Sequence, residues 1–179
     1  MQGSEQQLAV PVQVVSAEQA LVPAARAIVI DTNIVLDLFI FADPATPPLR
    51  AALESKSLRW IATQVMRDEL ERVLAYTHIV PRLVFYQLKP ADVLARFDAM
   101  VQIVAAAPKV QLNCKDADDQ KFIDLAAAHQ AILLSKDHAV LALAKRLRAF
   151  GVHTSMVFAS HCVLAGDSGR QRQHLIPLQ

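Results

Sequence analysis

The segment Ala27-Ile28-Val29-Ile30-Asp31-Thr32-Asn33 joins an apolar run to a polar turn. Its short, continuous and largely β-branched run before Asp31 is typical of a buried strand. A second apolar run follows over residues 34–41 and predicts a buried helix over 32–41. A strand that ends at a carboxylate and turns into a helix is the arrangement of ligand sites in open α/β sheets. Asp31 is therefore the first candidate site residue.

Strand-like and helix-like runs alternate along the rest of the chain. We predict further strands over 58–62, 110–112, 131–134 and 152–157. We predict helices over 49–56, 63–75, 81–87, 91–104, 139–150 and 159–164, and one that begins at Asp118 or Asp119 and ends near Gln130. This alternation predicts an α/β fold of three layers: a mainly parallel sheet of about four to five strands with helices on both faces.

Length and composition predict a single globular domain. The chain has 179 residues, of which 54% are hydrophobic and 20% charged, so it can bury a real core. We expect a weakly ordered extension over 1–25, the folded domain over 26–166 and a polar tail over 167–179. The net charge of +1 excludes a large basic footprint for nucleic acid and leaves room for a local one.

The cysteines and the apolar runs bear on location. Cys114 and Cys162 are the two cysteines of the chain, and neither lies in a metal-type spacing. This usage fits a reducing compartment, so we expect a cytoplasmic protein without a disulfide framework. No apolar run approaches the roughly 20 residues of a membrane helix, and the N-terminal residues lack the pattern of a signal peptide.

Three acids follow a predicted strand or begin a predicted helix: Asp31, Asp119 and Asp137. Parallel strands bring their carboxyl ends to one edge of the sheet, so Asp31 and Asp137 share that edge if their strands are neighbours. Asp119 begins a helix, where a carboxylate is favoured by the free N–H groups. Taken alone, Asp119 would be an ordinary N-cap and Asp137 an ordinary loop acid. The prediction of a shared site therefore rests on the acids taken together.

Helical phase, at about 100° per residue, separates inward acids from solvated ones. Asp119 lies in the middle of its helix's apolar face, whereas Asp124 is predicted to point away from it. Glu69 lies roughly 60° from the centre of an apolar stripe, while Asp68 and Glu71 lie roughly 140–160° from it. That stripe consists of Val65, Met66, Leu70, Val73 and Leu74.

The inward acids predict a cation site. Phase gives no inward Arg or Lys to match Asp31, Glu69, Asp119 and Asp137, and an unpaired carboxylate on an apolar face is costly. Oxygen ligands favour hard cations such as Mg²⁺ or Mn²⁺ over zinc. Carboxylates that hold such ions can activate water and stabilise the leaving oxygen of a phosphodiester.

Four segments in order resemble the motifs of the PIN-domain family, in its branch of VapC-like toxins of type II toxin–antitoxin systems. The resemblance covers about residues 27–164. Its four segments are the strand with Asp31-Thr32-Asn33, the helix Glu69-Leu70-Glu71-Arg72-Val73-Leu74, the segment Asp116-Ala117-Asp118-Asp119-Gln120-Lys121-Phe122, and Ser135-Lys136-Asp137. The third segment has Ala117 where this branch usually has proline, which affects only the turn.

The resemblance implies a metal-dependent ribonuclease that cleaves RNA. It implies that Asp31, Glu69, Asp119 and Asp137 ligate Mg²⁺ or Mn²⁺, directly or through water. Asn33 and Ser135 would be supporting hydrogen-bonding groups. Asp116, Asp118 and Asp119 compete for one role; phase favours Asp119, and a register change of one residue would favour Asp118. A homodimer and an antitoxin partner are likewise implied by the resemblance alone.

Two other classes of function are compatible with part of this pattern. A phosphotransfer enzyme also has an Asp after its first strand, but the phosphatase type needs a second Asp where this chain has Asn33. The receiver type needs its acidic pair at the first strand, and here the pair comes late. A binding module without catalysis, which only engages a protein partner, would not need the four acids intact.

Overall fold

The computed structural model of the protein describes residues 25–159. Residues 1–24 of the extension predicted over 1–25 lie outside the described residues. So do residues 160–164 of the helix predicted over 159–164 and the tail predicted over 167–179.

A five-stranded sheet forms the middle of the fold, in the order β3-β2-β1-β4-β5. All neighbouring strands pair in parallel. The predicted α/β class and parallel sheet are therefore confirmed. The strands are β1 (Arg26–Ile30), β2 (Leu58–Ala62), β3 (Gln102–Ile103), β4 (Ile132–Leu134) and β5 (His153–Ser155).

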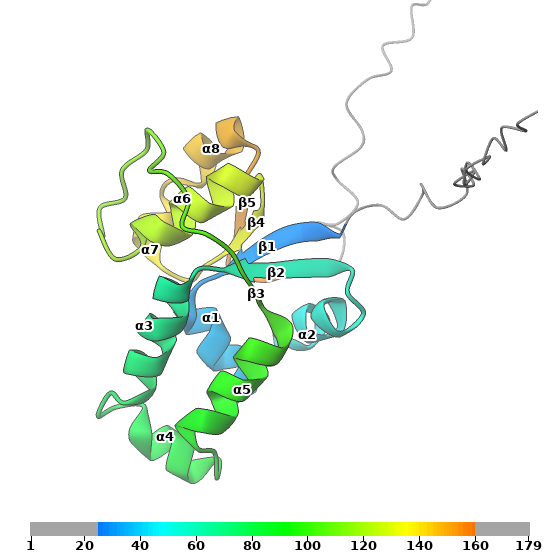
Figure 1. The fold of residues 1–179 in the computed structure, drawn as a ribbon, viewed down its shortest axis with the longest axis vertical. Coiled ribbons are helices and arrows are strands. Elements are labelled where there is room, and N and C mark those ends of the chain that lie inside the picture. The colour runs from blue at the N-terminus through cyan, green and yellow to red at the C-terminus, as the bar shows by residue number, and fades with distance from the viewer. Residues whose placement is uncertain (1–24, 160–179) are drawn as a thin grey trace, which may run out of the picture.

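Helices lie on both sides of this sheet, as Figure 1 shows, with α1 to α5 gathered on one side and α6 and α8 on the other. Within the described residues, no helix has the length and apolar character needed to cross a membrane. The helices are α1 (Thr32–Leu36), α2 (Pro47–Glu54), α3 (Gln64–Leu74), α4 (Val80–Phe85), α5 (Pro90–Met100), α6 (Gln120–His129), α7 (His138–Leu141) and α8 (Ala144–Leu147).

The central strands are buried because their side chains are apolar on both faces. Residues 27–30 of β1 and all of β4 are buried, as the continuous apolar runs predict. Trp60 of β2 anchors one side of the core, with its ring centroid 5.0 Å from that of Phe97 and 6.1 Å from that of Phe39. These ring contacts tie α5 and the turn after α1 to the sheet.

The register of β1 and β4 determines where the first site residues emerge. Ile30 pairs with Leu134 at the end of both strands. The Asp31 N–H then donates to the Leu134 carbonyl at 2.9 Å, which extends the parallel ladder by one bond. Asp31 and Ser135 therefore leave the sheet side by side, at the edge where parallel α/β sheets bind ligands.

The predicted strand over 110–112 is wrong. The Val110 N–H donates to Asp124 Oδ1 of α6 at 3.0 Å, so a side chain takes the place of a strand partner. The edge strand lies earlier, at Gln102–Ile103, inside the region predicted as the end of the helix over 91–104. That helix ends at Met100.

The single helices predicted over 139–150 and 32–41 are each divided. The helix predicted over 139–150 becomes α7, α8 and a 3₁₀ turn over Arg148–Phe150. It breaks where the Leu143 N–H bonds to the Val140 carbonyl, only three residues back. Gly151 ends the segment with φ +75°, as predicted for a C-cap. In the segment predicted as one helix over 32–41, α1 continues into a π-helical turn over Asp37–Phe41.

Candidate active site

Asp31 is a buried carboxylate at the end of β1, with 3% of its surface exposed. Ser135, which follows β4 and is fully buried, donates from Oγ to Asp31 Oδ2 at 2.7 Å. The same Oγ accepts from the Asp137 N–H at 3.0 Å. Burial raises the pKa of Asp31, the hydrogen bond from Ser135 opposes this, and the charge of Glu69 adds to it. Ser135 thus orients the carboxylate of Asp31.

Glu69 of α3 faces Thr32 at the start of α1. Thr32 Oγ1 donates to Glu69 Oε1 at 3.0 Å. Asp68 and Glu71 are exposed, as helical phase predicted, while Glu69 is half-buried. One member of the predicted stripe differs, because Val65 is 58% exposed. Thr32 was absent from the predicted site, although its place beside Asp31 and its hydroxyl were visible in the sequence.

Lys121 of α6 corrects the prediction that no cation faces the acids. Its Nζ forms an ion pair with Glu69 Oε2 and also donates to the Asp118 carbonyl. The Lys121 side chain is 20% exposed and the Glu69 side chain is 17% exposed. Phase missed Lys121 because a long side chain can reach around its helix to a partner on another element.

Asp119 precedes α6 without capping it through its side chain. Its Oδ2 is buried and has no hydrogen-bond partner among the described residues. Burial, together with the charges of Asp31, Asp137 and Asp116, raises the pKa of Asp119 to about 7. The capping explanation therefore fails for Asp119, and the charges of Asp31 and Asp137 act on its carboxyl group.

The other two acids of this segment lie differently. Asp118 and Asp116 are exposed. Asp116 Oδ1 accepts from the Asp118 N–H at 2.9 Å, which is a local turn contact. The geometry therefore favours Asp119 over Asp118 as the inward acid. Asn33, predicted as a supporting group, is also exposed.

Asp137 is the N-cap of α7. Its Oδ1 accepts from the Ala139 N–H at 2.6 Å. This is the ordinary capping role that the residue would have without any other function. Its charge nevertheless contributes to the raised pKa of Asp119. Asp31, Glu69, Asp119 and Asp137, whose charges act on one another in this way, are called the cluster of acids below.

Asp124 does not point to solvent, contrary to the helical-phase prediction. It is 9% exposed and accepts from Val110 N–H at 3.0 Å and from Gln120 Nε2 at 2.7 Å. Gln120 also accepts from the Cys114 N–H at 2.8 Å and donates to the Leu112 carbonyl at 2.9 Å. Asp124 and Gln120 therefore fasten the segment before α6 that carries Asp119.

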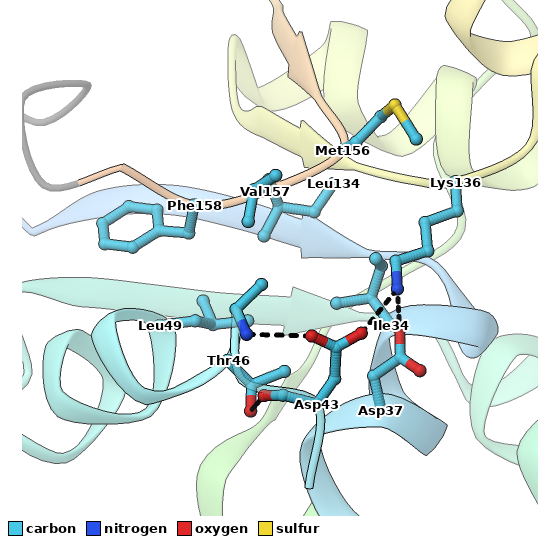
Figure 2. A pocket seen from close by; sticks show the side chains of 11 residues that line it. Ile34, Asp37, Asp43, Thr46, Leu49, Leu134, Lys136, Met156, Val157 and Phe158 are labelled. Atoms are coloured by element: carbon cyan, nitrogen blue, oxygen red, sulfur yellow. Dashed lines mark hydrogen bonds and ion pairs between the residues drawn. The ribbon is translucent and has the colours of Figure 1, made fainter. Parts of the chain in front are cut away.

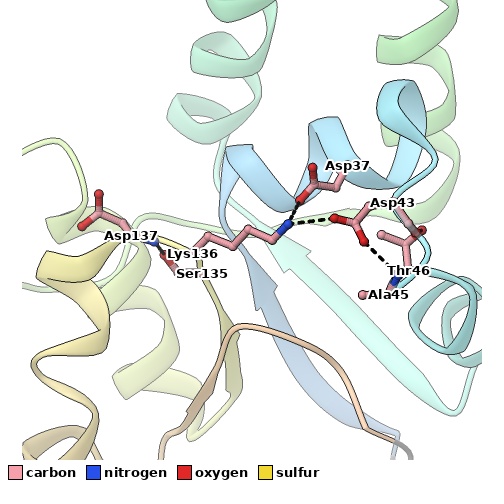
Figure 3. Close-up of polar contacts among 7 residues, drawn as sticks. All are labelled: Asp37, Asp43, Ala45, Thr46, Ser135, Lys136 and Asp137. Atoms are coloured by element: carbon pink, nitrogen blue, oxygen red, sulfur yellow. Dashed lines mark hydrogen bonds and ion pairs between the residues drawn. The ribbon is translucent and has the colours of Figure 1, made fainter.

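Lys136 points away from Asp137, as Figure 3 shows, although the two residues are adjacent in the sequence. Its Nζ lies 2.7 Å from Asp37 Oδ2 and 2.9 Å from Asp43 Oδ2. Asp43 also accepts from the Ala45 N–H at 2.8 Å. Lys136 therefore links the turn after β4 to the loop after Phe41 and stays outside the cluster of acids.

A small cavity lies beside this Lys136 group (Figure 2). Its volume of about 10 Å³ admits about one water molecule. None of the four predicted ligands lines it. Its lining combines Asp37, Asp43 and Lys136 with apolar side chains that include Ile34, Leu49, Leu134 and Phe158.

The donor chemistry of the four acids fits a hard cation. Within residues 25–159, no three His, Cys, Asp or Glu side chains are already arranged to hold a metal ion together. Glu69 is turned to Lys121, and Asp137 caps α7. The available oxygens are all carboxylates, and the buried Asp119 Oδ2 has no protein partner. An oxygen donor set of this kind matches Mg²⁺ or Mn²⁺.

Comparison with known proteins shows the family to which the chain belongs. The sequence pattern of the family described as PIN domain matches residues 27–139, which contain all four acids. The match spans more than half of the 179 residues. No curated protein matches the chain. The chain therefore belongs to the PIN-domain family, whose members are generally nucleases.

Proposed function

We propose that the protein is an endoribonuclease that uses Mg²⁺ or Mn²⁺ to hydrolyse phosphodiester bonds of RNA. The observation that carries the proposal is the buried, unpartnered oxygen of Asp119 beside the charges of Asp31 and Asp137. Burying a carboxylate among other carboxylates is unfavourable unless a cation joins them. Membership of the PIN-domain family supports the same reading.

Asp31, Glu69, Asp119 and Asp137 would hold the cation, directly or through water. A bound divalent ion supplies an activated water and stabilises the leaving oxygen of the phosphodiester. Ser135 holds Asp31 in position through its 2.7 Å hydrogen bond, and Thr32 holds Glu69 through its 3.0 Å bond. These hydroxyls keep the carboxylates oriented, as hydrogen-bonding groups around metal ligands commonly do.

The biological setting is part of the same proposal. We infer a cytoplasmic toxin of a toxin–antitoxin pair, which acts as a homodimer and binds an antitoxin protein. The support is the order and spacing of the four acidic segments, above all Asp116-Ala117-Asp118-Asp119 followed by Lys121-Phe122. A separate test of this part is to purify the chain together with a bound antitoxin protein. The chain should be released when that antitoxin is degraded.

Cleavage of RNA by the purified full chain tests the catalytic proposal. We expect cleavage with Mg²⁺ or Mn²⁺ and none with EDTA. Asp31→Asn should reduce the rate by on the order of 100-fold or more, because the anchoring carboxylate is lost. Asp68→Asn is the matched control, since Asp68 is exposed on α3. Equal activity in the wild type and Asp31→Asn would contradict the proposal.

A further inference from the structure

Lys121 is held within the cluster of acids by three contacts. Its ammonium group pairs with Glu69 Oε2, donates to the Asp118 carbonyl, and lies 4.7 Å from the centre of the Phe122 ring. The side chain is largely buried. The charge of Lys121 also reaches Asp119, whose pKa it lowers against the stronger effects of burial and the neighbouring acids.

Two other basic side chains close to the site in sequence pair with other acids. Arg67 of α3 pairs with Glu71 and Asp98 rather than with one of the four acids. Lys136, the other lysine close to the site in sequence, is bound to Asp37 and Asp43 (Figure 3). Lys121 therefore brings a positive charge into direct contact with this cluster.

Both oxygens of Glu69 are already engaged. Oε1 accepts from Thr32 and Oε2 is paired with Lys121. A divalent cation that binds Glu69 beside Asp31 and Asp119 would bring its own charge against the ammonium group. Like charges at such short range repel strongly in a partly buried site. The contact of Glu69 with Lys121 therefore opposes its use as a metal ligand.

We propose that Lys121 is an internal competitor of the divalent cation for Glu69 and so sets the cation concentration at which the site fills. This inference rests on the proposed metal dependence and adds a residue that regulates metal binding. In the absence of the metal, Lys121 neutralises Glu69. In its presence, Lys121 is displaced from that carboxylate, and the displacement weakens metal binding.

The affinity of the full chain for Mn²⁺, measured by titration calorimetry, tests the competition. Lys121→Met keeps the length of the side chain and removes its charge, so we expect Mn²⁺ to bind about tenfold more tightly. Lys121→Arg keeps the charge and should bind nearly as the wild type does. Lys115→Met removes the same charge from an exposed position in the same segment and controls for net charge. An affinity of Lys121→Met no higher than that of Lys115→Met would overturn the proposal.

Thermal unfolding gives a second result that does not depend on activity. With EDTA, Lys121→Met should melt below the wild type, because Glu69 loses its counter-ion. Saturating Mn²⁺ should raise its melting temperature more than that of the wild type, because a tighter ligand stabilises more. An equal rise in both proteins would count against competition.

The results separate this inference from the ribonuclease proposal. If Lys121→Met binds Mn²⁺ more tightly but no variant cleaves RNA, the competition stands and the ribonuclease proposal fails. If the wild type cleaves RNA while the affinities are equal, only the competition fails. If no variant binds Mn²⁺, both fail.

Discussion

Ser135 Oγ donates a 2.7 Å hydrogen bond to Asp31 Oδ2 and so joins two residues that lie 104 positions apart in the chain. Each residue directly follows one of two neighbouring parallel strands, β4 and β1. The bond is buried, and Ser135 also accepts from the Asp137 N–H. One hydroxyl thus connects two of the four acids and makes the sheet edge a defined site.

Removing this hydroxyl should lower stability. Ser135→Ala leaves a buried Asp31 oxygen and the Asp137 N–H without their partner, so we expect the free energy of unfolding to fall by about 1–3 kcal/mol. Urea denaturation measures the change. Ser155→Ala is the control, because that hydroxyl bonds to the exposed Val157 carbonyl. A loss in Ser135→Ala no greater than in the control would mean that the buried bond contributes little.

The raised pKa of Asp119 predicts a pH dependence of stability in EDTA. The pKa rises from 3.8 to about 7, chiefly through burial. Between these values the folded protein keeps a proton that the unfolded chain has lost, so this group's contribution to stability falls as pH rises. Asp119→Asn should therefore melt increasingly above the wild type from pH 5 to pH 8. Asp118→Asn, at an exposed position, should show no such trend.

Binding of Mn²⁺ should reverse this trend. Protons compete with the cation for Asp119 and Asp31, whose pKa values are both raised above 3.8 by burial. We expect Mn²⁺ to raise the melting temperature more at pH 8 than at pH 5.5. The measurement is a pair of melting curves, with EDTA and with Mn²⁺, at each pH. A stabilisation that is independent of pH would show that these carboxylates do not bind the ion.

The contacts of Asp124 predict that it holds the segment before α6. Asp124→Ala leaves the Val110 N–H and one Gln120 donor without their acceptor. We expect a loss of about 1–3 kcal/mol in unfolding free energy and faster hydrogen exchange at the Val110 amide. Asp118→Ala, at an exposed position in the same region, serves as the control. Unchanged exchange at Val110 would refute the role.

Local periodicity explains which parts of the site the sequence could predict. The strand–Asp31–helix pattern is continuous in the chain, and the phase of a regular helix is enough to predict that Glu69 faces inward. The contacts of Asp124 and Lys121 were missed because their partners, Val110 and Glu69, lie on other segments. Such pairings depend on tertiary structure, which periodicity does not encode. The division of the helix over 139–150 has no Gly or Pro signal within it.

A crystal structure of the protein with Mn²⁺ would show whether the four acids bind one ion. We predict an anomalous density peak among Asp31, Glu69, Asp119 and Asp137, about 2.0–2.2 Å from oxygens of at least Asp31 and Asp119. The peak should be absent from crystals of Asp31→Asn. Density found only elsewhere, or none among the four acids at a Mn²⁺ concentration that supports RNA cleavage, would contradict the account.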